Sequence, residues 1–438
     1  MTFGPYNVDY EQRIYNPERM RKYRLDRAHA ALKKHGLGSM IVYDYDSWRY
    51  LGFHTRHNYA RRRPGNFLLL IRDAGYPYTH TDQYAPTSET ELMPWFEGRL
   101  TMEHQVRFQM GCIMDEKYVA EQWKRSAEEV KDLLKQHGVL DEPCGIDYTS
   151  NEMIDACRKA GINIVSGNRA IADARLIKNE DEIECCRMAG AITESAHWEV
   201  CKALRPGITE LQIAGVAAKA LYDLGAEELE GPSFVVCSGY RASHNVPAMP
   251  SDRIVRPGEM FIIDINGVGF QGYRTCFYRT YLVGDKPTEF QKQIYQDCYE
   301  FQRSLETNVK PGITSHDWLQ GVMKDGGGRY PGPIWPEPGR YFMGAACHPL
   351  GLCSGDPGPM LRPTRTGTKF PTLEEPPFMI EKGMVFAIEG GAWDWDGKKW
   401  AYDGVKLENV GVVTDTGCEI LYRSPYKDLI ACGLPGKY

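Results

Sequence analysis

Residues 260–281 have the sequence MFIIDINGVGFQGYRTCFYRTY, in which Asp264, Asn266 and Cys276 lie in or beside runs of apolar residues. A run of this kind is typical of a strand that is buried in a protein core. Burying a carboxylate in such a strand costs several kcal/mol unless a cation or strong hydrogen-bond donors compensate for it. The segment therefore predicts a buried polar site as well as a buried strand.

Three later segments repeat this combination of a polar side chain and an apolar run. They are AACHPLG with His348, VFAIEGG with Glu389, and GVKLENVGVV with Glu408. Because several acids and a histidine in such contexts can share one compensating charge, we expect them to form one site in the second half of the chain.

The order and spacing of these residues resemble the pita-bread family, which includes methionine aminopeptidase, aminopeptidase P, prolidase and creatinase. The resemblance extends from PERMRKYRLDR near the start to SPYKDLIACG near the end, and within the family it is closest to the dimethylsulfoniopropionate lyases. It implies an α/β (α+β) fold with an N-terminal creatinase-like domain, residues 1–165, and a C-terminal pseudo-twofold pita-bread domain, residues 166–438.

The family binds two divalent cations through two aspartates, a histidine and two glutamates that follow the first strand aspartate. By that resemblance the metal-ligand positions in this chain are held by Asn266, Cys276, His348, Glu389 and Glu408. A thiolate prefers zinc or iron, and a neutral asparagine removes one negative charge from the site. We therefore expect one zinc or iron ion, with Asp264 orienting the substrate or a water molecule; a metal-free site is the alternative.

Two further residues have catalytic roles by resemblance. His244, in GYRASHNVPAMPSD, matches a histidine that acts as general acid and base in creatinase. The lyases place a proton-removing acid six residues after the metal-binding histidine, where this chain has Ser354. Asp356, two residues further on, is the candidate for that role.

A cationic segment in the first domain, HTRHNYARRRPGN, contains His57, Arg61 and Arg62. In creatinase-like relatives this region reaches the pocket of the partner subunit, which implies a homodimer. A guanidinium group has a fork of donors that suits a carboxylate, so these residues are candidates for binding an acidic substrate.

The composition is that of an ordinary soluble enzyme, with 42% hydrophobic and 25% charged residues among 438. The net charge of −6 and the absence of a long basic stretch argue against nucleic acid as a partner. No apolar run is long enough to predict a membrane span. The 13 cysteines show no disulfide-scaffold spacing, which favours the cytoplasm.

A repeated sequence motif supports a duplicated second domain. RPGITELQIAGV and KPGITSHDWLQGV both run from a basic-Pro-Gly-Ile-Thr turn into a predicted helix, with Thr209 and Thr314 as candidate N-caps. In the first domain the pattern predicts long helices that end near Gly36 and Gly138. Long loops rich in glycine and proline are predicted at residues 326–340 and after His348.

These observations lead to a hydrolase or lyase that cleaves a C–S or C–N bond in a small, carboxylate-bearing molecule other than a peptide. Four alternatives remain open: a dimethylsulfoniopropionate lyase, a metal-free creatinase-like amidinohydrolase, an Xaa-Pro aminopeptidase or dipeptidase, and a non-catalytic binding module.

Overall fold

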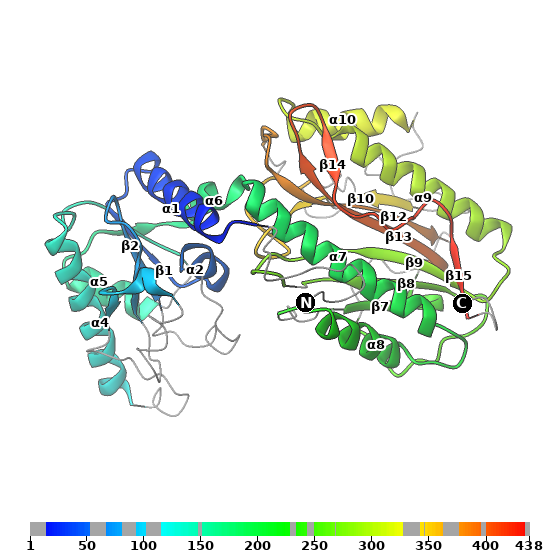
Figure 1. Ribbon diagram of the computed structural model, residues 1–438, viewed down its shortest axis with the longest axis horizontal. Helices are drawn as coiled ribbons and strands as arrows, with labels where there is room; N and C mark the ends of the chain where they lie inside the picture. The colour runs from blue at the N-terminus through cyan, green and yellow to red at the C-terminus, as the bar shows by residue number, and fades with distance from the viewer. Residues whose placement is uncertain are drawn as a thin grey trace. The chain divides into compact units, whose positions relative to one another are not determined.

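The computed structural model describes residues 15–52, 67–80, 93–101, 115–147, 151–227, 234–242, 249–267, 269–326, 342–345, 347–361, 376–395 and 400–433 (Figure 1). They divide into two compact units, one of residues 16–176 and one that contains the chain from residue 177 onwards. The expected boundary after residue 165 precedes helix α6 (Asn168–Leu176), which packs against α1 (Pro17–Lys34) and therefore belongs to the first unit.

The first unit is built on a six-stranded sheet with the strand order β4-β3-β2-β1-β5-β6. The strands are β1 (Ser39–Val42), β2 (Phe67–Ile71), β3 (Tyr78–His80), β4 (Leu100–Thr101), β5 (Cys144–Ile146) and β6 (Ile164–Ser166). The other helices are α2 (Tyr45–Gly52), η2 (Pro94–Phe96), α4 (Glu116–Gln136) and α5 (Asn151–Lys159). Strand β1 pairs antiparallel with β2 and parallel with β5, so the sheet is mixed.

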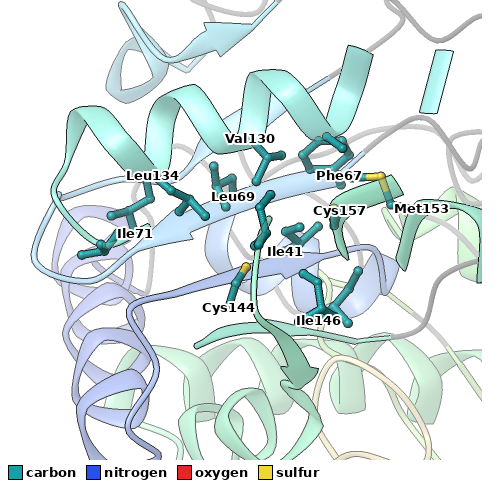
Figure 2. Packing of buried hydrophobic residues seen from close by; sticks show 14 of the residues in the cluster. Ile41, Phe67, Leu69, Ile71, Val130, Leu134, Cys144, Ile146, Met153 and Cys157 are labelled. Atoms are coloured by element: carbon teal, nitrogen blue, oxygen red, sulfur yellow. The ribbon is translucent and has the colours of Figure 1, made fainter. Parts of the chain in front are cut away.

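The core of this unit forms where α4 crosses the sheet (Figure 2). Val130 and Leu134, one helical turn apart, pack with Phe67, Leu69 and Ile71 of β2 in a buried apolar cluster. Each large apolar side chain buried in this way stabilises the fold by about 1.5–3 kcal/mol. The helix begins at the N-cap Asp115, and Gly138 follows it with a φ of 70°, so the predicted helix end near Gly138 is confirmed.

The second unit contains two sheets. One has the order β15-β9-β8-β7, and the other has the order β10-β12-β13-β14 with β11 paired to β12. Its strands are β7 (Phe234–Ser238), β8 (Met260–Ile265), β9 (Tyr278–Val283), β10 (Phe342–Ala345), β11 (His348–Pro349), β12 (Val385–Trp395), β13 (Trp400–Val413), β14 (Cys418–Ile420) and β15 (Ile430–Cys432). Its helices are α7 (Glu180–Ala203), α8 (Glu210–Asp223), η4 (Gly239–Arg241), α9 (Glu289–Asn308) and α10 (Ser315–Asp325).

The two sheets meet along β9 and β13. The Thr280 hydroxyl donates a hydrogen bond to the Lys406 carbonyl at 2.9 Å and accepts one from the Lys406 N–H at 2.8 Å. Because these two strands are adjacent, side chains from β8 and β9 can share one site with side chains from β12 and β13.

The repeated sequence motif corresponds to two copies of one local structure. Thr209 and Thr314 are the N-caps of α8 and α10, and each forms a reciprocal capping box with the third helical residue. The glycine of each turn has a positive φ, 90° at Gly207 and 81° at Gly312. Both glycine N–H groups donate to a backbone carbonyl at 2.9 Å, that of Val255 and that of Ile380. The predicted caps are therefore confirmed.

Among the described residues, no helix is long and apolar enough to cross a membrane. Residues 327–340 of one predicted loop and much of the loop after His348 fall outside the described ranges.

Candidate active site

Five of the predicted site residues come from adjacent strands of the second unit. Asp264 lies on β8, and Cys276 lies two residues before the start of β9. His348 lies on β11, where it pairs with Ala387, and Glu389 lies two residues further along β12. Glu389 is directly opposite Glu408 in the β12–β13 register. The strand order thus brings together positions that are far apart in the sequence.

Cys276, His348 and Glu408 form a compact group of possible metal ligands. One ligand atom from each residue lies within 4.8 Å of the other two, and His348 Nε2 is 4.0 Å from Glu408 Oε1. His348 Nδ1 is 3.0 Å from the Pro349 carbonyl oxygen. A proton on Nδ1 that is donated to this carbonyl leaves the lone pair on Nε2, the atom that faces Glu408.

The Glu408 carboxylate is fully buried, and its two oxygens have different surroundings. Oε2 accepts a hydrogen bond from the Tyr278 N–H at 3.2 Å, whereas Oε1 has no hydrogen-bond partner among the described residues. Burial, followed by repulsion from Glu389 and Asp264, raises the pKa of Glu408 well above its usual value. Lys406 and the Cys276 thiol offset only part of this effect, so a cation beside Oε1 would favour the ionised form of Glu408.

The Cys276 thiol is likewise disfavoured in its ionised form. Burial and the neighbouring carboxylates, chiefly Glu408, raise the pKa of Cys276 well above its usual value. A bound cation is what ionises a buried thiol, because the thiolate is the form that binds metal. Together, the orphaned Oε1 and a sulfur, nitrogen and oxygen donor set fit a single zinc or iron ion.

Glu389 has a partner that the sequence analysis did not identify. Lys406 Nζ is 2.7 Å from Glu389 Oε2 and 3.7 Å from the centre of the Tyr278 ring. Burial lowers the pKa of Lys406, but Glu389, Glu408 and Asp264 outweigh this effect and the net pKa is raised. Lys406 is therefore an ammonium ion at this site. The only sequence signal for it is a lysine that alternates with Glu408 in an otherwise apolar strand.

Asp264 and Asn266 lie close to this pair. Asp264 Oδ1 accepts a hydrogen bond from the Phe277 N–H at 3.0 Å, and burial, partly offset by Lys406, raises the pKa of Asp264 to about 7. Asn266 Oδ1 accepts a hydrogen bond from the Ser354 hydroxyl at 2.6 Å. The roles expected for Asp264 in orienting substrate, and for Asn266 and Glu389 as ligands, stay predictions.

Asp356 is held by another cation. Its Oδ2 is 2.7 Å from Lys178 Nζ, and the two side chains are only 2% and 3% exposed. A Cβ at Gly351 would lie 2.2 Å from Asp356 Oδ2, so only a glycine leaves room for this carboxylate. Its role as a proton-removing base stays a prediction. In that role the Asp356 carboxylate would accept a proton while it is paired with Lys178.

Four predicted residues cannot be placed. His244, His57, Arg61 and Arg62 lie outside the described residues. Their expected roles as proton shuttle and substrate-binding groups stay predictions.

Comparisons with known proteins identify the family of this chain. The sequence profile of metallopeptidase family M24 matches residues 184–415, more than half of the chain. The probable dipeptidase PepE of Mycobacterium tuberculosis is 25% identical over 287 residues, 64% of this chain and 67% of that protein. The Xaa-Pro dipeptidase of Pyrococcus horikoshii is 28% identical over 258 residues, 58% of this chain and 64% of that protein. The chain thus matches about two thirds of the length of these relatives.

Solved structures show the same fold. The Xaa-Pro dipeptidase from Bacillus anthracis aligns with a TM-score of 0.68 at 20% identity, over 94% of this chain and 99% of that chain. A dipeptidase from Pyrococcus horikoshii aligns with a TM-score of 0.69 at 19% identity, over 93% of this chain and 99% of that chain.

The expected mixed α/β architecture with a pita-bread domain is confirmed, and so is the expectation of an enzyme. The relatives reported above are named as dipeptidases. They do not support the expectation that this chain is most similar to the dimethylsulfoniopropionate lyases. The family match over more than half of the chain leads to one conclusion: this chain is an enzyme of metallopeptidase family M24.

Proposed function

We propose that this protein is a hydrolase that cleaves the C–N bond of a small Xaa-Pro dipeptide, with one zinc or iron ion held by Cys276, His348 and Glu408. The observation that carries the proposal is the buried Glu408 Oε1, which lacks a hydrogen-bond partner in the described part of the chain and lies 4.0 Å from His348 Nε2. The dipeptidase names of the relatives support the substrate class, and for that reason peptide cleavage is placed ahead of the non-peptidase reaction expected from the sequence.

The protein's own residues prepare the site in three ways. The Tyr278 N–H holds Glu408 Oε2 and so directs Oε1 towards His348. The Pro349 carbonyl fixes the tautomer of His348, and Lys406 holds the Glu389 carboxylate. A divalent cation bound by the three ligands supplies Lewis-acid activation of water or of the substrate carbonyl.

The test is release of proline from Ala-Pro, Gly-Pro and Met-Pro by protein loaded with zinc or iron(II). We expect metal-loaded protein to contain about one equivalent of metal and to turn over at least one dipeptide. Glu408→Gln should lose both properties. Glu289→Gln, the same change at a side chain that is 90% exposed, should keep both. Loaded protein that releases no proline overturns the substrate class, and protein that never retains metal overturns the site.

A second candidate is the non-peptidase hydrolase or lyase acting on a small carboxylate-bearing molecule. It is favoured by the Lys406–Glu389 ion pair, which gives the site a fixed ammonium group beside the ligands. Cleavage of dimethylsulfoniopropionate by loaded protein that ignores dipeptides selects the lyase. Cleavage of creatine by metal-free protein selects the amidinohydrolase, and inactivity in every assay selects the binding module.

A cytoplasmic homodimer forms part of this proposal. In the described part of the chain the cysteines are free thiols, which is typical of a reducing compartment. Light scattering on the purified protein tests the dimer, because a monomeric mass in the active preparation contradicts it.

A further inference from the structure

When all of its acidic groups are ionised, the candidate active site carries more negative charge than one metal ion can balance. Asp264, Glu389 and Glu408 are all buried, and the Cys276 thiol lies with them. With all four groups ionised the site carries a charge of about −4, and one dication reduces this to about −2. Buried like charges repel strongly, so the fully ionised site needs a second positive charge nearby.

The position of Lys406 supplies that charge. Lys406 and Glu408 are two residues apart on β13, so both side chains point to the same face of the strand. Lys406 is opposite Gly391 in the β12–β13 register, a residue without a side chain, and the Trp393 ring lies over this glycine. From there it reaches diagonally to Glu389, and its ammonium is 2.7 Å from Glu389 Oε2 and 3.7 Å from the centre of the Tyr278 ring.

We propose that Lys406 is a built-in cation that occupies the acidic position formed by Glu389 and Asp264, and that it thereby limits the site to one divalent ion. The inference rests on the proposed function, in which Cys276, His348 and Glu408 hold that ion. It assigns Lys406 a positioning role: the ammonium holds Glu389 in place and excludes a second metal by repulsion and by filling its place.

The direct test is a manganese titration of zinc-loaded protein, followed by electron paramagnetic resonance. Manganese prefers carboxylate oxygens, which are the donors that Glu389 and Asp264 would offer without Lys406. We expect the wild-type protein to bind no further manganese and Lys406→Met to bind about one equivalent. Lys406→Arg should behave like the wild type, because it keeps the charge. Lys219→Met, at a side chain that is 76% exposed, is the matched control.

Each outcome separates this inference from the proposed function. Wild-type protein that retains no zinc overturns the proposed function. A zinc-loaded wild type that also binds manganese, or a folded Lys406→Met that binds none, overturns only the role of Lys406.

If Lys406→Met does not fold, cobalt binding by Glu389→Gln tests the inference instead. The binding is measured by the thiolate-to-cobalt absorption band of Cys276. This variant leaves the Lys406 ammonium without its carboxylate partner, so the cobalt affinity should fall about tenfold. Lys406→Met/Glu389→Gln, which removes both charges, should restore it. An affinity that does not fall, or a loss that the double variant does not restore, overturns the inference; the second result identifies Glu389 as a metal ligand.

Discussion

Glu389 and Glu408 face each other across β12 and β13, yet their carboxylates have different partners. Glu389 Oε2 is bound by the ammonium of Lys406 at 2.7 Å. Glu408 Oε1, within the described ranges, has no hydrogen-bond partner and lies beside His348. One acid therefore has its cation in the chain, and the other needs one from solution. The comparison teaches that the number of acids in a site does not give the number of metal ions it holds.

Removing the acid that needs an external cation should have the largest effect. Glu408→Gln keeps the shape of the side chain but removes the charge that binds the ion. We expect zinc affinity to fall about 1,000-fold, or about 4 kcal/mol, measured by competition with a chelator. An affinity within about threefold of the wild type places the ion elsewhere and removes the distinction between the two glutamates.

A buried ion pair outside the ligand group provides the next test. Asp356→Asn leaves Lys178 buried without its partner, so the free energy of unfolding should fall by about 3 kcal/mol in urea titration. Asp415→Asn breaks an exposed pair with Lys382 and should cost less than about 1 kcal/mol. Zinc content should stay unchanged in both. If Asp356→Asn abolishes turnover without loss of stability, Asp356 is a catalytic group.

Lys406→Met should have a smaller effect on stability, because this ion pair is partly exposed, with 18% of the Lys406 side chain accessible. We expect the metal-free protein to lose about 2 kcal/mol of unfolding free energy. The double variant with Glu389→Gln should recover most of it, because no unpaired charge remains. If the double variant instead loses as much unfolding free energy as the two single variants together, the two side chains do not interact, which contradicts the ion pair.

The smallest expected effect concerns pH and a residue behind the site. His197 hydrogen-bonds the Tyr281 hydroxyl and the Phe277 carbonyl, and burial lowers the pKa of His197 from 6.5 to about 3. The unfolded chain therefore binds a proton that the folded chain does not, so stability is present above pH 6.5 and is lost below it. Between pH 6.5 and about pH 5.5 this loss should be about 1 kcal/mol.

His197→Gln should remove this part of the loss of stability at low pH. The loss is measured by urea unfolding of metal-free protein at both pH values. An unchanged slope assigns the acid sensitivity to other groups, including the acids of the active site.

Much of the fold follows from local patterns in the sequence. The threonine at each turn predicts the N-caps of α8 and α10, Thr209 and Thr314. The acids of β8, β12 and β13 stand out because a charged residue in an apolar strand needs compensation. These signals are carried by neighbouring residues, so they survive without knowledge of the tertiary structure.

The sequence does not reveal which charges pair. A lysine in an alternating strand looks like a solvent-facing residue, and only the strand register places Lys406 diagonally opposite Glu389. Likewise, Lys178 and Asp356 are 178 positions apart and meet only in the folded chain. The expected grouping of Glu389 with the metal ligands did not include these lysines, although each forms an ion pair with one of the predicted site acids.

The most direct test of a single-metal site is a crystal structure of zinc-loaded protein with anomalous data at the zinc edge. We expect one peak per chain, within bonding distance of Cys276 Sγ, His348 Nε2 and Glu408 Oε1, with Lys406 still bound to Glu389. Two peaks, or a single peak coordinated by Glu389 with Lys406 displaced, would contradict this expectation.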